Sequence, residues 1–214
     1  MTRLAIIVGL RAEARLARRL NVPVFAGGGT AAGAEAAAWR AVAAGADALL
    51  SFGLAGGLDP KLRPGDVLVP DVVLVDGRDV LTDLAICKNL GGPTPHRVLG
   101  AATIVADAAT KHRLWCETGA AGVDLESGPV ARVALQHSLP FAVLRAVCDP
   151  AERGLPPAAL AALDQRGAIG FARVLASVMA HPAQIPSLLA VAADAAVARR
   201  ALMRRIGSIT SLLS

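Results

Sequence analysis

The sequence predicts an α/β fold with three layers, α/β/α, around a central mixed and mostly parallel sheet. Three observations predict it. Short apolar runs alternate with alanine-rich segments of helical length along the 214 residues. The apolar runs end in glycine, proline or a charged residue, as buried strands do. The length suits one core, so residues 1–214 are expected to form a single domain with a helical extension over about 183–214.

The predicted strands are short and rich in Val, Ile, Leu and Phe, which is typical of strands buried on both faces. Pro70 interrupts one of them because proline cannot donate to a strand ladder. In chain order the strands are expected at 3–9, 22–26, 48–52, 67–75, 98–106, 122–125 and 141–148.

The predicted helices are rich in alanine and repeat their apolar residues at helical spacing. They are expected at 11–20, 31–44, 127–138, about 157–180 and about 186–213. Residues 53–66 and 76–97 are polar and contain glycine and proline, so they are expected to be loops, the second with one helical turn at most. Residues 107–116 fit either a helix or a strand.

Composition excludes several classes of protein. With 54% hydrophobic and 18% charged residues the chain is globular, yet it has no apolar run of about 18 residues that spans a bilayer. The N-terminal LAIIVGL is followed at once by charged residues, so it is expected to be a strand of a cytoplasmic protein and not a signal peptide. Three separated cysteines and four scattered histidines predict neither disulfides nor a metal site. The net charge of +5 permits an anionic partner, but with 3% aromatics and no tyrosine a nucleic-acid partner is not expected.

Charged residues stand where predicted strands end. The apolar run FAVLRAVCD contains Arg145 and closes on Asp149, and Glu13 and Glu126 follow two other strands. In α/β sheets ligands bind at the carboxyl ends of strands, and crowding of carboxylates there raises at least one pKa, as a general acid needs. The alternative for each carboxylate is a helix cap or a first-turn acid, and taken singly Glu126 and Asp149 are better explained in that way. Together with Arg145, the set indicates a site.

Two glycine loops follow consecutive strands. Gly53, Gly56 and Gly57 lie in SFGLAGGLDPKLRPGD, and Gly27–Gly29 follow the strand at 22–26. Glycine lets a ligand approach the backbone N–H groups closely. Neither loop has the spacing of a phosphate loop or a dinucleotide fingerprint, and the alternative is an ordinary turn. Their succession favours a binding site.

The motifs IIVGLRAEARL, AGGGTAAG, SFGLAGGLDPKLRPGDVLVP, VDLESGPVARVA and PFAVLRAVCD resemble, in this order, the purine nucleoside phosphorylase/nucleosidase superfamily. The resemblance extends over about residues 3–175 and is similar to the methylthioadenosine/S-adenosylhomocysteine nucleosidase branch. It implies a phosphorylase/hydrolase-like fold, a purine nucleosidase or nucleoside phosphorylase activity, no cofactor apart from phosphate as a candidate co-substrate, and a homodimer.

The resemblance also implies roles for single residues. Asp149 protonates N7 of the departing purine, Glu126 binds the ribose hydroxyls, Glu13 orients or deprotonates the attacking water, and Arg145 helps to hold that water or a phosphate. Arg11 is a further candidate for binding phosphate. The remaining candidates for substrate binding are Gly28, Leu54, Ala55, Gly56, Leu125 and Cys148.

Several residues depart from the nucleosidase pattern. Leu54 and Cys148 stand where the nucleosidases carry serines, and Ala109 where a phenylalanine stacks on the base, leaving Trp115 or Phe52 as substitutes. The segments SFGLAGGLDP, VDLES and HPAQIPSLL…ARRALMRRI resemble the hopanoid-associated phosphorylase branch instead. That resemblance implies adenosylhopane, a lipid-linked nucleoside, as the substrate.

The C-terminal helix has two interpretations. Leu202, Ile206, Ile209 and Leu213 share one face, and Arg200, Arg204 and Arg205 the other. Such a helix binds an anionic membrane surface, which would place the chain at the inner face of the cytoplasmic membrane, or else packs its apolar face on the domain.

Other functions stay open at this point. Water and phosphate are both candidate nucleophiles, and a methylthioadenosine-type nucleosidase and a non-catalytic nucleoside- or lipid-binding protein are the alternatives. An NAD-dependent enzyme is disfavoured because no strand leads into GxGxxG.

Overall fold

The computed structural model describes residues 3–157, 159 and 180–213, so the helix predicted at about 157–180 falls almost wholly outside the described residues. Within them, nine strands form one sheet in which β2, β1, β3, β8, β7, β5 and β6 lie side by side, and β9 pairs with β3 and β4. The strands are β1 (Leu4–Val8), β2 (Val24–Ala26), β3 (Ala48–Gly57), β4 (Val67–Leu68), β5 (Pro70–Val75), β6 (Arg78–Leu81), β7 (Thr94–Gly100), β8 (Gly122–Asp124) and β9 (Phe141–Asp149).

The sheet is mixed and mostly parallel, as predicted. Five pairs are parallel: β1–β2, β1–β3, β3–β9, β5–β7 and β7–β8. Three are antiparallel: β3–β8, β4–β9 and β5–β6. The central strand β3 is longer than expected because its first part pairs with β1 and β9, and its glycine-rich end, Gly56–Gly57, pairs with β8.

The helices begin where side chains can cap them. Thr30, Asp83 and Asp107 each accept a hydrogen bond from a first-turn N–H group at the start of α2, α3 and α4. The helices are α1 (Arg11–Ala17), α2 (Ala31–Ala43), α3 (Leu84–Asn89), α4 (Ala108–Thr118), α5 (Ser127–Gln136) and α8 (Ile185–Leu213), with short 3-10 helices at Arg18–Leu20 and Pro182–Gln184.

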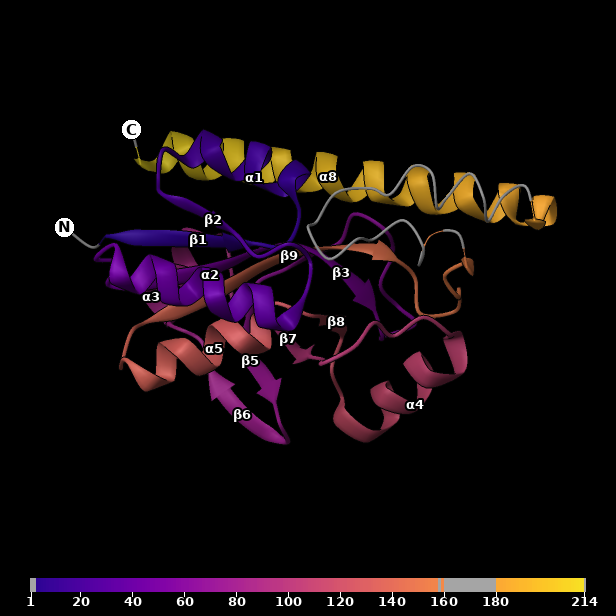
Figure 1. Ribbon diagram of the computed structural model, residues 1–214, viewed down its shortest axis with the longest axis horizontal. Coiled ribbons are helices and arrows are strands. Elements are labelled where there is room, and N and C mark those ends of the chain that lie inside the picture. Colours follow the sequence, from indigo (N-terminus) through magenta and orange to yellow (C-terminus); the bar gives the residue numbers. More distant parts are fainter. Residues whose placement is uncertain (1–2, 158, 160–179, 214) are drawn as a thin grey trace.

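Helices cover both faces of the sheet, which confirms the three-layer prediction (Figure 1). Because side chains alternate along a strand, Ile6 and Leu50 face the cluster under α1 and α8, and Ile7 and Leu49 face the cluster under α2 and α5. Alanines at the helix contacts let α2 lie close to the strands. The two clusters are the core of the protein.

The prediction for residues 76–97 is wrong. This segment contains β6, α3 and the start of β7, not a polar loop. Asp76 and Gly77 both have positive φ and form the turn of a hairpin between β5 and β6, and this Asp-Gly pair is a recognised hairpin signal. The strand expected at 98–106 is β7 at Thr94–Gly100, and the ambiguous segment 107–116 is helix α4.

The C-terminal helix packs on the domain. Leu202, Ile206 and Ile209 of α8 are 0%, 2% and 4% exposed and belong to the core cluster with β1, β3 and β9, whereas Arg200 and Arg204 are exposed. The face that could have entered a membrane is therefore buried, although the side chain of Leu213 is outside the described set. Within the described residues, no helix has both the length and the apolar character to cross a bilayer.

Candidate active site

Three segments bring charged side chains together around β3: the start of α1, the end of β8 with the residues that follow it, and β9. Glu13 lies in the first turn of α1 just after β1, Asp124 and Glu126 lie at the end of β8, and Arg145 and Asp149 lie on β9. All five are buried, with exposures of 7% or less. Buried charged groups need polar partners. By their contacts the five residues form two groups, one around Arg145 and one around Asp149.

The first group centres on Arg145. Its Nε lies 2.9 Å from Asp124 Oδ2, and its Nη2 lies 3.1 Å from Glu126 Oε2. Nη2 also donates to Ser51 Oγ at 2.7 Å, and Nη1 donates to the carbonyl oxygen of Leu54 at 3.3 Å. Nη1 and Nη2 thus have hydrogen-bond acceptors, whereas Nε has the ion pair with Asp124 and no well-aligned hydrogen bond. The surrounding carboxylates outweigh the cost of burial and raise the pKa of Arg145.

Glu13 is fixed by two backbone donors. Its Oε2 accepts from the Leu10 N–H at 2.7 Å and its Oε1 from the Leu54 N–H at 2.9 Å. Burial raises the pKa of Glu13, while the charge of Arg145 and these N–H groups act in the opposite direction. The carboxyl group is therefore held rigidly and is a weaker acid than a solvated glutamate.

Glu126 has a strongly raised pKa. Burial is the main cause that raises its pKa to about 8, Arg145 opposes this, and the charges of Asp124 and Glu13 add to it. At neutral pH Glu126 is mostly protonated in the unliganded protein. The prediction that crowded carboxylates raise at least one pKa is confirmed for Glu126, where Asp124 and Glu13 add to the effect of burial, whereas burial alone raises the pKa of Glu13.

Two glycines make this arrangement possible. A Cβ at Gly9 would lie 2.3 Å from Glu126 Oε1 and 3.4 Å from Glu13 Oε2. A Cβ at Gly53 would lie 2.5 Å from both Arg145 Nη1 and Glu13 Oε1. The three distances of 2.5 Å or less are shorter than any Cβ contact in a folded protein, so the glycines leave space for the charged groups to converge.

The second group centres on Asp149. Its Oδ2 accepts a hydrogen bond from Lys111 Nζ of α4, and its Oδ1 accepts one from the Cys148 thiol at 3.4 Å. Burial and the neighbouring Asp149 carboxylate raise the pKa of Cys148 well above its usual value, so the thiol keeps its proton. A Cβ at Gly56 would lie 3.3 Å from Asp149 Oδ1, which places this carboxylate oxygen against β3.

The two groups lie along the same strand. The first faces Gly53 and the second faces Gly56, three residues further on, which is roughly 10 Å of extended chain. One group therefore offers an arginine with three carboxyl groups, and the other a single carboxylate with a lysine. Such a pair of sites suits a ligand with two different polar ends.

Other predicted residues have varied positions. Leu54 contributes its backbone N–H and C=O to the first group, while its side chain packs on the core beside α1. Gly56 lies against Asp149, and Ala55, which precedes Gly56 on β3, is buried. Leu125 and Gly28 are partly buried, and Arg11 is exposed although Glu13 is not.

Phe52 and Trp115, the two candidates to stack on the base, both pack within hydrophobic clusters. Phe52 is 0% exposed and belongs to the core under α1 and α8, so it cannot contact a ligand. Trp115 is partly buried and packs against a small cluster that includes Leu58 and Val123. The interpretation of Phe52 as a base-stacking residue is therefore wrong.

Four polar residues of the site were not predicted from the sequence: Ser51, Lys111, Asp124 and Ser127. Asp124 accepts from the N–H groups of Glu126 and Ser127 and so begins α5, and its place just before Glu126 in VDLES was the available signal. Lys111 is 0% exposed. Nothing in the polar segment TKHR distinguishes it from a solvated lysine.

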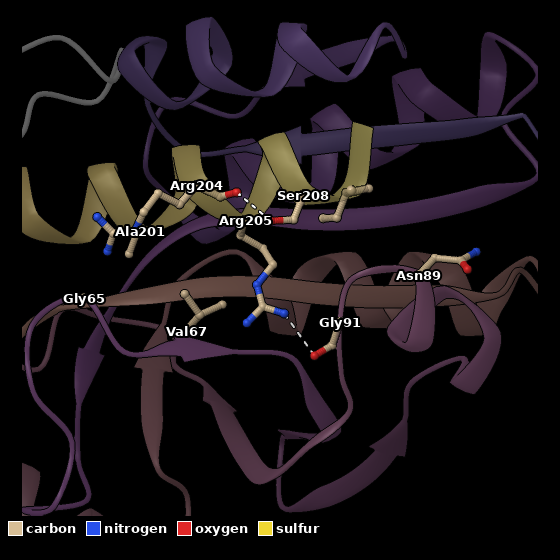
Figure 2. A pocket seen from close by; sticks show the side chains of 9 residues that line it. Gly65, Val67, Asn89, Gly91, Ala201, Arg204, Arg205 and Ser208 are labelled. Carbon is tan, nitrogen blue, oxygen red and sulfur yellow. Dashed lines mark hydrogen bonds between the residues drawn. The ribbon is translucent and has the colours of Figure 1, made fainter. Parts of the chain in front are cut away.

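A cavity of about 310 Å³ lies elsewhere, between α8 and the turns before β4 and after α3. Figure 2 shows Arg205 reaching from α8 across this cavity to the carbonyl oxygen of Gly91. It also donates to the carbonyl oxygen of Leu90, both at 3.0 Å. Arg205 thus holds α8 on the domain, and the residues that line the cavity include none of the buried carboxylates.

This arrangement of sheet, glycines and buried carboxylates agrees with comparisons to known proteins. The family model described as Phosphorylase superfamily matches residues 19–97 and 87–180. The chain belongs to the phosphorylase superfamily. The expected class of enzyme, a purine nucleosidase or nucleoside phosphorylase, is confirmed at the level of this superfamily, and no curated protein sequence matches the chain.

Solved structures confirm the fold of this phosphorylase-superfamily chain. A methylthioadenosine/S-adenosylhomocysteine nucleosidase from Colwellia psychrerythraea, in complex with adenine, superimposes with a TM-score of 0.65 at 17% identity over 84% of this chain and 96% of the other. The futalosine hydrolase of Helicobacter pylori gives 0.64 at 17% identity over 83% and 97%. A nucleosidase variant of Helicobacter pylori with 5'-methylthioadenosine in the active site gives 0.67 at 15% identity over 97% and 99%.

Proposed function

We propose that this chain cleaves the N-glycosidic bond of an adenine nucleoside with water. The observation that carries the proposal is the pair of charged groups along β3, one at Gly53 and one at Gly56. A nucleoside likewise has two separate polar parts, a sugar and a base, and each can contact one of the two groups. Solved nucleosidases of this fold bind adenine and 5'-methylthioadenosine.

The base is assigned to the Asp149 side. Asp149 donates a proton to N7 of the purine, which turns a poor leaving group into neutral adenine as the bond to C1' breaks. The electron pair of that bond stays with the purine, and the sugar becomes cationic. Asp149 is a single buried carboxyl group on this side, so it is the group available for this transfer.

The sugar is assigned to the Arg145 side. Glu126 hydrogen-bonds the ribose hydroxyls, and the positive charge that develops on the sugar favours its ionised form over the protonated form of the empty site. Glu13, held by the N–H groups of Leu10 and Leu54, orients the attacking water and accepts its proton.

Water fits this site better than phosphate as the nucleophile. All three nitrogens of Arg145 already contact Asp124, Glu126, Ser51 or Leu54. A phosphate dianion would also lie beside the Asp124 carboxylate that pairs with Arg145, and like charges at a few ångströms repel strongly where the dielectric constant is low. Arg145 therefore organises the carboxyl groups instead of binding the nucleophile.

Within this activity, we propose adenosylhopane as the substrate. The proposal is supported by the resemblance of SFGLAGGLDP and VDLES to the hopanoid-associated branch. It is also supported by the apolar start of α8, where Ile185 and Leu189 are 42% and 67% exposed. Figure 1 shows this part of α8 running past the carboxyl end of β9, and Arg153 just after Asp149 pairs with Asp194 of α8. An apolar substituent on the nucleoside can lie along it.

The test is adenine release from adenosylhopane and from methylthioadenosine, in detergent, with and without phosphate. We expect release from adenosylhopane that does not depend on phosphate. Release that requires phosphate would identify a phosphorylase, and release from methylthioadenosine alone would identify a nucleosidase for small substrates.

The substitution Asp149→Asn should lower this release about 10²- to 10⁴-fold, the usual contribution of a general acid. Asp71→Asn, at an exposed position of β5, is the control. Release that falls less than about threefold would remove Asp149 from the mechanism, and no release by the unmodified chain would favour a nucleoside-binding protein. A homodimer stays a prediction, which sedimentation of the purified chain tests.

A further inference from the structure

Lys111 is a fully buried lysine that the chemistry described above does not use. It lies in α4, is 0% exposed, and points toward the segment that follows β9. Its Nζ donates to Asp149 Oδ2, to the carbonyl oxygen of Pro150 at 3.0 Å and to that of Arg153 at 2.9 Å. A buried lysine is rare unless it is paired.

The three contacts define its charge. An ammonium group has three N–H donors and no acceptor, and all three acceptors of Lys111 are oxygens. A neutral amine would place its lone pair against one of these oxygens. Lys111 is therefore an ammonium ion, and its ion pair with Asp149 is shielded from water, since their side chains are 0% and 7% exposed.

The contacts also distinguish the two oxygens of Asp149. Oδ2 accepts a hydrogen bond from Lys111 of α4, whereas Oδ1 accepts one from the weakly donating thiol of Cys148. A thiol is easily displaced as a donor, whereas a buried ammonium is not. Within the described residues, Oδ1 is therefore the oxygen of Asp149 that has no strong donor, and a ligand can displace the thiol from it.

We propose that Lys111 is the positioning residue for Asp149: it anchors Oδ2 so that Oδ1, which takes up a proton from solvent as the nucleoside binds, delivers that proton to the leaving base. This inference rests on the proposed nucleoside cleavage. Lys111 acts through Asp149 and touches no substrate. Loss of the anchor leaves a buried carboxyl group that can rotate, and a displacement of about 1 Å can cost on the order of 10²-fold in rate.

The experiment compares two leaving groups. The first substrate is adenosylhopane or methylthioadenosine, whichever the unmodified chain cleaves, and the second is 4-nitrophenyl riboside, whose leaving group departs without protonation. For Lys111→Met we expect kcat on the adenine nucleoside to fall about 10²-fold with KM within about threefold, and kcat on the nitrophenyl riboside to change less than about threefold. Lys88→Met, an exposed lysine of α3, is the matched control.

A double-mutant cycle keeps the inference testable if the single variant is unstable. Lys111→Met combined with Asp149→Asn removes both charges, so no ion is left buried alone. In the Asp149→Asn background, Lys111→Met should change kcat on the adenine nucleoside less than about twofold, because its partner is already absent.

Three results would overturn the inference. Equal losses on both substrates would show general damage to the fold, and undiminished kcat on the adenine nucleoside would show that Asp149 needs no anchor. A further large loss in the Asp149→Asn background would show that Lys111 acts elsewhere. If the unmodified chain cleaves neither adenosylhopane nor methylthioadenosine, the proposed function itself is wrong. This inference then fails with it, before any variant is measured.

Discussion

Glu126→Gln should change how the stability of this protein depends on pH. The pKa of Glu126 rises from its usual 4.5 to about 8 in the folded chain. Between these two pH values the folded chain holds a proton that the unfolded chain has released. Unfolding therefore becomes easier as the pH rises through this window, by linkage.

The magnitude follows from the two pKa values. At about 1.4 kcal/mol for each pH unit, the interval corresponds to on the order of 5 kcal/mol of unfolding free energy lost between pH 4.5 and pH 8. Glutamine is uncharged at all these pH values and still offers an oxygen to Arg145. Between pH 4.5 and pH 8, the free energy of unfolding of Glu126→Gln should therefore fall by several kcal/mol less than that of the unmodified chain. At pH 8 the variant should be the more stable of the two proteins.

The assay is urea denaturation at pH 5, 6, 7 and 8, followed by circular dichroism. Glu117→Gln, at an exposed position of α4, is the control and should keep the slope of the unmodified chain. Glu13 also has a raised pKa, so part of the slope should persist in Glu126→Gln. If the slope of Glu126→Gln equals that of the unmodified chain, burial of a protonated Glu126 is refuted.

Three further predictions test the packing around the site. Arg145→Met should lower the free energy of unfolding by about 3–5 kcal/mol, since it leaves Asp124 and Glu126 buried without a cation, and thermal melts check this against the exposed control Arg204→Met. Gly53→Ala should lower adenine release at least about tenfold because its Cβ displaces Arg145 and Glu13, and a crystal structure with unmoved side chains would contradict the reason given. Arg205→Met should lower the free energy of unfolding by about 1.5–3 kcal/mol through its lost bonds to the carbonyls of Leu90 and Gly91, with adenine release unchanged, and urea denaturation measures the loss.

The sequence was sufficient for most elements and for the edge at which the site lies. Apolar runs ended by glycine or a carboxylate placed β1, β3, β8 and β9, and strand ends in an α/β sheet are where ligands bind. Glu13, Glu126, Arg145 and Asp149 were therefore predicted to converge, and the structure brings each of them to β3 or its neighbours. The segment 76–97 failed because short polar strands and a six-residue helix carry little periodicity.

The tertiary structure decided what the apolar face of α8 contacts, which the residue types leave open. Whether the apolar face of α8 met a membrane or the domain depended on the sheet it could reach, and Leu202 and Ile206 are buried in that sheet's core.

The partners of the charges also depended on the fold. Lys111 reaches Asp149 across 38 positions of sequence, and Arg145 reaches Leu54 across 91. A sequence records which residues carry charge and where strands end, because both are local properties. Which charge neutralises which, and how far burial shifts a pKa, depends on contacts between distant segments that only the folded chain brings together.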